Sequence, residues 1–137
     1  MLIAVAGASG RLGRAFLLYC HQKGLPVLAL LRSAQTAEKL PPDTPYAIVG
    51  YGGSGGAHAI SRELAAATHV VNLTGSTDTT LFEDDLFDAN VVPTKLLMDA
   101  TPQAIERFVH LSSIAVYGKN LSRLDLLDEN TPKKPHD

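Results

Sequence analysis

Three glycines near the start of the chain have the spacing of a phosphate-binding turn. Gly7, Gly10 and Gly13 stand three residues apart in GASGRLG, between an apolar run and a helical pattern. In a turn from strand to helix, the first glycine permits the sharp turn, the second lets a diphosphate approach the backbone, and the third lets helix and strand pack closely. The free N–H groups at the helix start then face the anion. The triplet therefore predicts a dinucleotide site, with a purely structural turn as the alternative.

The elements that must position this turn alternate between strand and helix. Short apolar runs predict strands, and apolar residues at helical spacing predict helices. The expected strands are residues 2–6, 25–31, 46–49, 69–73 and 107–112, and the expected helices are residues 11–23, 57–67 and 82–100. Such alternation requires parallel pairing through right-handed crossovers. We therefore expect an α/β fold, a doubly wound parallel sheet of the Rossmann type with strand order 3-2-1-4-5.

Two local signals mark helix ends within this pattern. Gly24 directly follows the first helical pattern and predicts its C-terminal cap. Thr80 stands three residues before Glu83 and predicts a capping box at the start of the long helix.

Length and composition fit an ordinary globular protein. The 137 residues are 45% hydrophobic and 19% charged, with a formal net charge of -2, so nothing favours nucleic acid or an anionic membrane as a partner. We expect one dinucleotide-binding domain over residues 1–118 and a polar segment over residues 119–137. No apolar run has the length that spans a bilayer, which predicts a cytoplasmic protein.

Residue types that bind metals or form disulfides are present without the required pattern. Cys20 is the only cysteine and lies among apolar neighbours, which is typical of a buried structural thiol. His58, His69 and His110 are far apart in the sequence, and the acidic residues between positions 83 and 88 are typical of a solvated first helical turn. We therefore expect no metal site.

Three further stretches accompany the GxxGxxG turn: HVVNLTG at 69–75, NVVPTKLL at 90–97 and RFVHLSSIAVYG at 107–118. Together they resemble the extended branch of the short-chain dehydrogenase/reductase superfamily, the NAD-dependent epimerase/dehydratase family. Pro93 stands where that family usually has glycine. The resemblance covers nearly the whole chain. It implies a nicotinamide dinucleotide as coenzyme and hydride transfer on a sugar nucleotide or a related hydroxyl or carbonyl compound.

The resemblance also implies catalytic residues. Ser113, the second serine of the SSxxVYG block, would hold the reacting oxygen of the substrate; by residue type alone, it could equally bond to local backbone at a strand end. The family's acid/base pair is a tyrosine followed four residues later by a lysine, and the chain contains no YxxxK. The final stretch, LLDENTPKKPHD, resembles the family segment that precedes this pair. We therefore expect the N-terminal portion of a longer enzyme, inactive by itself and without the C-terminal strands and substrate lobe.

The choice of coenzyme depends on the end of the second strand. Family members that use NAD place an acidic residue there, whereas this chain has Leu31 followed by Arg32 and Ser33. A site with a cation and no carboxylate favours NADP over NAD, with a solvated arginine as the alternative. Tyr51 replaces a family aspartate that contacts adenine, and could stack on the base. The expected coenzyme contacts are Gly7, Ser9, Gly10, Arg11, Leu12, Gly13, Arg32, Ser33, Tyr51, Leu73, Thr74 and Gly75.

Two expectations concern the wider role of the chain. The rival to an enzyme is a non-catalytic NADP-binding module, a redox sensor or scaffold that uses the same fold. In a chain that lacks the later strands, residues 107–112 would form a sheet edge with unpaired backbone and exposed apolar surface, so we expect self-association into a homo-oligomer.

Overall fold

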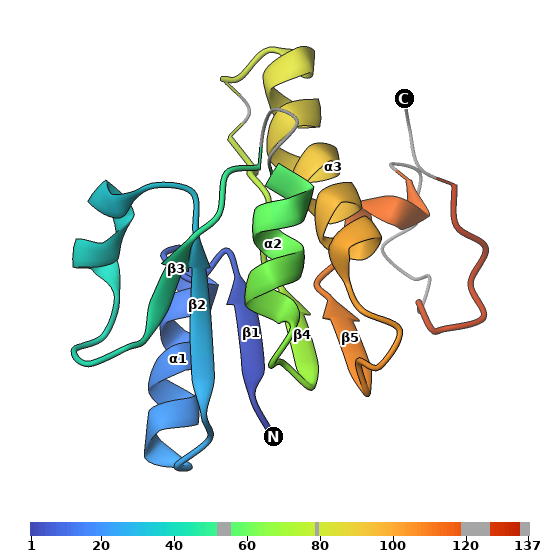
Figure 1. Cartoon of the computed structure of the whole chain (residues 1–137). Helices are drawn as coiled ribbons and strands as arrows, with labels where there is room; N and C mark the ends of the chain where they lie inside the picture. Colours follow the sequence, from blue (N-terminus) through green and yellow to red (C-terminus); the bar gives the residue numbers. More distant parts are fainter. Residues whose placement is uncertain (52–55, 79, 119–126, 135–137) are drawn as a thin grey trace.

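A five-stranded parallel sheet forms the centre of the computed structural model (Figure 1). The structure describes residues 1–51, 56–78, 80–118 and 127–134. The strands are β1 (Ile3–Ala6), β2 (Val27–Leu31), β3 (Tyr46–Ile48), β4 (His69–Asn72) and β5 (Arg107–His110). Their order, β3-β2-β1-β4-β5, confirms the strand order and the fold class predicted from the sequence.

Helices cover both faces of this sheet (Figure 1). The α-helices are α1 (Arg11–Gln22), α2 (Gly56–Leu64) and α3 (Glu83–Ala100), and short 3₁₀ helices follow β2 and β5 as η1 (Ala34–Lys39) and η2 (Ile114–Tyr117). Successive strand residues point to opposite faces. In β1, Ala4 and Ala6 therefore pack toward α2 and α3, while Ile3 and Val5 pack toward α1. Because both faces are covered, β1 and β2 are apolar almost throughout, as the sequence pattern indicates.

The ends of several elements differ from those expected. Residues 2 and 25 were expected to begin strands, but both precede the hydrogen-bonded pairing of the sheet. The three strands β1, β2 and β4 begin together where Ile3 pairs with Val27 and with His69. The capping box predicted from Thr80 and Glu83 is wrong. The N-cap of α3 is Phe82, without a side-chain cap, because the Thr80 hydroxyl instead donates a hydrogen bond of 2.6 Å to the Asp78 carboxylate.

The carboxyl ends of all five strands lie at one edge of the sheet, because the strands are parallel. From β1 the chain adds β2 and β3 on one side of the sheet, and it then adds β4 and β5 on the other side. The position between β1 and β4 is therefore a topological switch point, where open α/β sheets bind ligands. The loops after β1, β2, β3 and β4 therefore meet where a site is expected.

The polar segment predicted over residues 119–137 is described only for residues 127–134. This part returns to η2, where the Lys134 N–H donates to the Val116 carbonyl at 2.9 Å and the Tyr117 hydroxyl donates to the Asp128 carbonyl at 3.3 Å. Across the described ranges, no helix is long and apolar enough to cross a membrane. The same ranges contain no cluster of three or more histidine, cysteine or acidic side chains suited to a metal ion.

Candidate functional site

The glycine turn connects β1 to α1 through a backbone that only small residues allow. Gly7 has a φ of +74° and accepts a hydrogen bond of 3.0 Å from the Gly10 N–H. A Cβ on Gly13 would collide with the Gly7 carbonyl and with the Ala8 backbone. Gly10 caps α1 without a side-chain hydrogen bond. The first N–H groups of α1 consequently lack intrahelical partners and face outward from the helix start.

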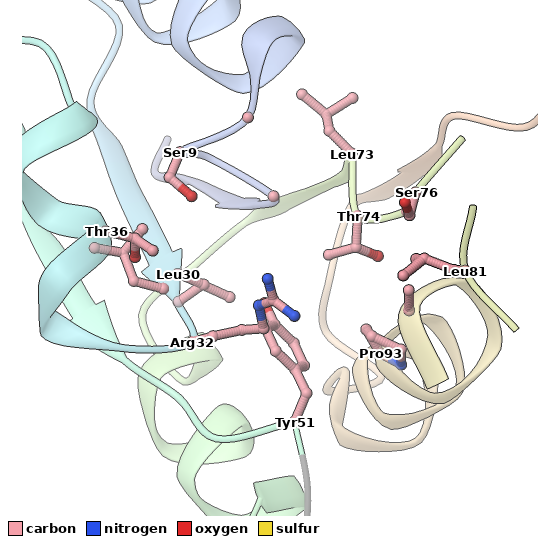
Figure 2. A pocket seen from close by; sticks show the side chains of 15 residues that line it. Ser9, Leu30, Arg32, Thr36, Tyr51, Leu73, Thr74, Ser76, Leu81 and Pro93 are labelled. Atoms are coloured by element: carbon pink, nitrogen blue, oxygen red, sulfur yellow. The ribbon is translucent and has the colours of Figure 1, made fainter. Parts of the chain in front are cut away.

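A cavity of about 330 Å³ lies beside this turn (Figure 2). It is bounded by the glycine turn, the end of β2, Tyr51 in the chain beyond β3, the loop after β4, and α3. Its described lining residues are Gly7, Ser9, Gly10, Leu30, Leu31, Arg32, Thr36, Tyr51, Leu73, Thr74, Gly75, Ser76, Leu81, Ala89 and Pro93. Eight of the predicted coenzyme contacts are therefore brought together: Gly7, Ser9, Gly10, Arg32, Tyr51, Leu73, Thr74 and Gly75.

The remaining predicted residues lie outside the cavity lining, namely Arg11, Leu12, Gly13, Ser33 and Ser113. Arg11 and Leu12 are exposed, and Gly13 is buried against the turn. Ser113 is exposed as the N-cap of η2, and its hydroxyl oxygen accepts a hydrogen bond of 3.2 Å from the Ala115 N–H. This contact is the local backbone bond considered in the sequence analysis. It leaves the Ser113 O–H proton free to donate.

Several lining residues were missed by sequence reasoning: Leu30, Leu31, Thr36, Ser76, Leu81, Ala89 and Pro93. Pro93 offered a signal, since it replaces a family glycine in the middle of a helical pattern. Ala89 precedes it by one helical turn, so both residues share a face of α3. The other residues are apolar or, like Thr36 of η1 and Ser76, small and polar, and nothing in their local spacing relates them to the glycine turn.

Arg32 is the only charged residue among the described residues that line the cavity. Tyr51 extends into the same part of the cavity from the chain after β3 (Figure 2). Its hydroxyl oxygen is buried and has no hydrogen-bond partner among the described residues. Burial raises the pKa of the Tyr51 hydroxyl above its usual value, and the positive charge of Arg32 opposes part of this rise. The Tyr51 hydroxyl is therefore protonated at neutral pH.

A buried polar network holds the loop after β4. Asn72 is completely buried at the end of β4, and its side-chain oxygen accepts hydrogen bonds from the Thr74 N–H and hydroxyl. The Asn72 amide nitrogen donates to the Thr94 hydroxyl of α3 at 3.0 Å and lies 3.1 Å from His110 Nδ1 of β5. The Asn72 side chain thus links β4, the loop that follows it, α3 and β5.

A second amide ties the same loop to α3. The Asn90 side-chain oxygen accepts a hydrogen bond of 2.9 Å from the Ser76 N–H, and its amide nitrogen lies 3.3 Å from the Ser76 carbonyl. The Asn90 amide also donates to the Leu86 carbonyl one turn earlier in α3, at 2.8 Å. Residues 73–76 form one wall of the cavity, and hydrogen bonds to Asn72 at Thr74 and to Asn90 at Ser76 therefore fix both ends of this wall.

The arrangement combines unpaired N–H groups at a helix start, one cation and an apolar slot between them. Such a cavity suits an elongated ligand with anionic and flat aromatic parts. With the parallel sheet and its 3-2-1-4-5 order, these features define an α/β protein of the Rossmann type. The chain belongs to the NAD dependent epimerase/dehydratase family, whose model matches residues 3–137. This membership confirms the family resemblance stated from the motifs.

Solved structures of related fold agree with this family. A short-chain dehydrogenase/reductase superfamily protein from Agrobacterium tumefaciens, solved with bound NAD, is 26% identical with a TM-score of 0.76, and the match covers 100% of this chain and 40% of that chain. The UDP-glucose 4-epimerase of Thermus thermophilus, in complex with NAD, is 23% identical with a TM-score of 0.80, covering 98% and 45%. The UDP-N-acetylglucosamine 4-epimerase of Bacillus cereus is 24% identical with a TM-score of 0.77, covering 98% and 44%.

The chain spans less than half the length of these solved proteins, between 40% and 45% of each. No curated protein matches it significantly.

Proposed function

We propose that this chain is the coenzyme-binding part of an extended short-chain dehydrogenase/reductase and that its coenzyme is NADP. The observation that carries the proposal is the cavity in which the glycine turn and Arg32 line the same space. Family membership over residues 3–137 supports an enzyme in preference to a non-catalytic sensor or scaffold.

The glycine turn would hold the diphosphate of the coenzyme. Gly7, Ser9 and Gly10 line the cavity where α1 begins. Backbone N–H groups there would donate to the phosphate oxygens, with help from the helix dipole. The Ser9 hydroxyl extends toward the cavity (Figure 2) and would add a further donor.

Arg32 would bind the 2′-phosphate that distinguishes NADP from NAD. The described lining residues include this guanidinium and no carboxylate. An arginine forms paired, charge-assisted hydrogen bonds with phosphate, whereas an acidic residue would repel it. Ser33 follows at the N-terminus of η1 and is half-buried, so its hydroxyl would complete the phosphate contacts.

The reaction we propose is transient hydride transfer on a sugar nucleotide or a related hydroxyl or carbonyl compound. The bound nicotinamide supplies the group that accepts or returns the hydride. Leu73, Thr74 and Gly75 would border the nicotinamide end of the cavity. Ser113 would donate a hydrogen bond to the reacting oxygen of the substrate and so help to hold it. The substrate class is supported by the family and by the two neighbours named as UDP-sugar epimerases.

Calorimetric titration of the 137-residue chain with NADP and with NAD tests this proposal. We expect both coenzymes to bind, with NADP about tenfold tighter because one charge-assisted contact is added. Tighter binding of NAD would overturn the role of Arg32. No heat with either coenzyme at millimolar concentration would overturn the proposed function itself.

A further inference from the structure

A histidine at the end of β5 completes the hydrogen bonding of a buried amide. Asn72 has no exposed surface. Its side-chain oxygen accepts from the Thr74 N–H and hydroxyl, and its amide nitrogen donates to the Thr94 hydroxyl and lies 3.1 Å from His110 Nδ1. An asparagine side chain has two acceptor and two donor positions, so every position is used. His110 supplies the one partner that lies outside both α3 and the loop after β4.

The orientation of the Asn72 amide follows from its other partners. The Thr94 hydroxyl donates its proton to the Asn90 carbonyl at 2.9 Å, so its oxygen can only accept from Asn72. The Thr74 N–H can only donate, and it lies 3.0 Å from the Asn72 oxygen. The amide nitrogen therefore faces His110, and Nδ1 of this imidazole is the acceptor, with the ring proton on Nε2.

The same amide joins the coenzyme cavity to the strand that leads to Ser113. His110 and Asn72 are paired in register across β5 and β4, and the Leu111 N–H donates to the Asn72 carbonyl at 3.0 Å. Ser113 follows Leu111 by two residues. Thr74, which the Asn72 side chain holds, lines the cavity (Figure 2). One buried residue thus supports both a wall of the cavity and the end of β5.

We infer that His110 is a positioning residue, whose Nδ1 holds the Asn72 amide in the orientation that places Thr74 at the coenzyme. His110 lies outside the described lining of the cavity, so it acts through Asn72 and not by contact with the coenzyme. Without an acceptor at this position, one buried amide proton has no partner. A tilt of the amide toward another acceptor would then loosen its contacts with Thr74. This inference rests on the proposed coenzyme site and adds a residue that positions it.

Two substitutions at position 110 test the acceptor. His110→Phe keeps a ring and removes Nδ1, so we expect about fivefold weaker binding of NADP in calorimetry. His110→Asn places a carbonyl oxygen at the same point along the side chain as Nδ1, and it should restore the affinity to within about twofold of the wild type. Wild-type affinity in a folded His110→Phe chain, or equal weakening in both variants, would overturn the inference.

His69→Phe is the matched control at the other edge of the sheet. His69 is the first residue of β4, and its Nδ1 lies 2.9 Å from the Thr68 hydroxyl. The substitution therefore also removes an imidazole contact, but at a position outside the cavity lining. We expect the affinity for NADP to stay unchanged in this variant, whatever its Tm. A loss of affinity as large as that of His110→Phe would show that binding follows general stability, and it would overturn the inference.

A double-mutant cycle shows whether His110 acts through Asn72. The Asn72→Leu chain lacks the amide that His110 holds, so the addition of His110→Phe should weaken NADP binding no further. Losses that add independently would overturn the positioning role. If Asn72→Leu does not fold, the two substitutions at position 110 decide the inference by themselves. Failure of both NAD and NADP to bind the wild-type chain would overturn the proposed function and this inference with it, whereas wild-type binding that His110→Phe leaves unchanged overturns the inference alone.

Discussion

Asn72 holds Thr74 through one side-chain oxygen, which accepts hydrogen bonds of 2.7 Å from the Thr74 hydroxyl and 3.0 Å from the Thr74 N–H. Asn72 has no exposed surface, whereas Thr74 lines the cavity. A buried group therefore fixes the position of a residue at the proposed coenzyme site. Ala6, Asn72 and His110 are in register across β1, β4 and β5, which places this contact at the carboxyl edge of the sheet.

Asn72→Leu should destabilise the chain and weaken coenzyme binding. The substitution leaves the Thr74 N–H without a partner and removes the bond to Thr94, which we expect to lower the free energy of unfolding by about 2 kcal/mol. Urea denaturation and calorimetry with NADP measure the two effects. His110→Phe is the control, because it removes only one contact of Asn72 at an exposed position. Wild-type stability in Asn72→Leu would contradict the structural role of the network.

Gly13→Ala should destabilise the chain more than Gly24→Ala. A methyl group at position 13 would collide with backbone atoms of the turn, which cannot move without displacing β1 or α1; we expect a loss of about 3 kcal/mol. Gly24 has a φ of +63° and nothing within 4 Å of an added Cβ, so only the backbone strain remains, about 1 kcal/mol. Thermal unfolding of the two variants compares them. Equal Tm values for the two variants would contradict a large energetic cost of an added methyl group at Gly13.

The strands could be predicted from the sequence because the central ones are covered on both faces. Ile3–Ala6 is buried at every position, so its apolar run is continuous and unlike the helical patterns beside it. Strand ends could not be predicted, since the ladder begins where Ile3, Val27 and His69 come into register, and register is a property of the assembled sheet. The helix start was predicted to within one residue, but its capping box was wrong, because the Thr80 hydroxyl donates to the Asp78 carboxylate and does not cap α3.

The candidate site could be predicted only where one local segment forms it. Gly7 and Gly10 lie in a turn whose spacing carries its own chemistry, and Arg32 follows an apolar strand at a position that the family defines. Ala89 and Pro93 share a helix face, yet their spacing cannot indicate that this face borders a turn far away in the sequence. Asn72 was available as a signal, because it is an amide that directly follows two valines at the end of a predicted strand.

Arg32→Leu should lower the affinity for NADP and leave that for NAD nearly unchanged. Arg32 supplies the only charge among the described lining residues, and loss of a charge-assisted phosphate contact corresponds to about tenfold to a hundredfold in affinity. The affinity of the wild type for NADP should also fall with added salt, because Arg32 is exposed. Arg14→Leu, an exposed α1 position outside the cavity, serves as the control. An equal loss for both coenzymes would contradict a 2′-phosphate contact.

Tyr51 should make the fold sensitive to alkali. The pKa of Tyr51 is raised by burial, so above pH about 10 the unfolded chain releases this proton while the folded chain retains it. Stability is fully present below that pH and falls by up to about 1.4 kcal/mol per pH unit as the pH rises toward the higher folded pKa. Unfolding of Tyr51→Phe should show a shallower decline between pH 9 and 11 than the wild type or Tyr19→Phe. Parallel profiles would contradict the burial of the hydroxyl.

The 137-residue chain should self-associate through the free edge of β5. Within the described residues, this strand pairs only with β4, so its other side carries unpaired N–H and C=O groups, which readily pair with another chain. Val109 is 45% exposed and Leu111 49% exposed on or beside this edge, and the apolar surface adds to the tendency to associate.

Val109→Lys should return the chain to a monomer, because a charge on an edge strand opposes strand pairing between molecules. Light scattering over a range of concentrations measures the change in apparent mass. Leu18→Lys makes a comparable change on α1, where Leu18 is 50% exposed, and it should leave the association intact. If both variants dissociate equally, general apolar surface rather than the β5 edge holds the molecules together, and a wild-type chain that stays monomeric at every concentration would contradict association through this edge.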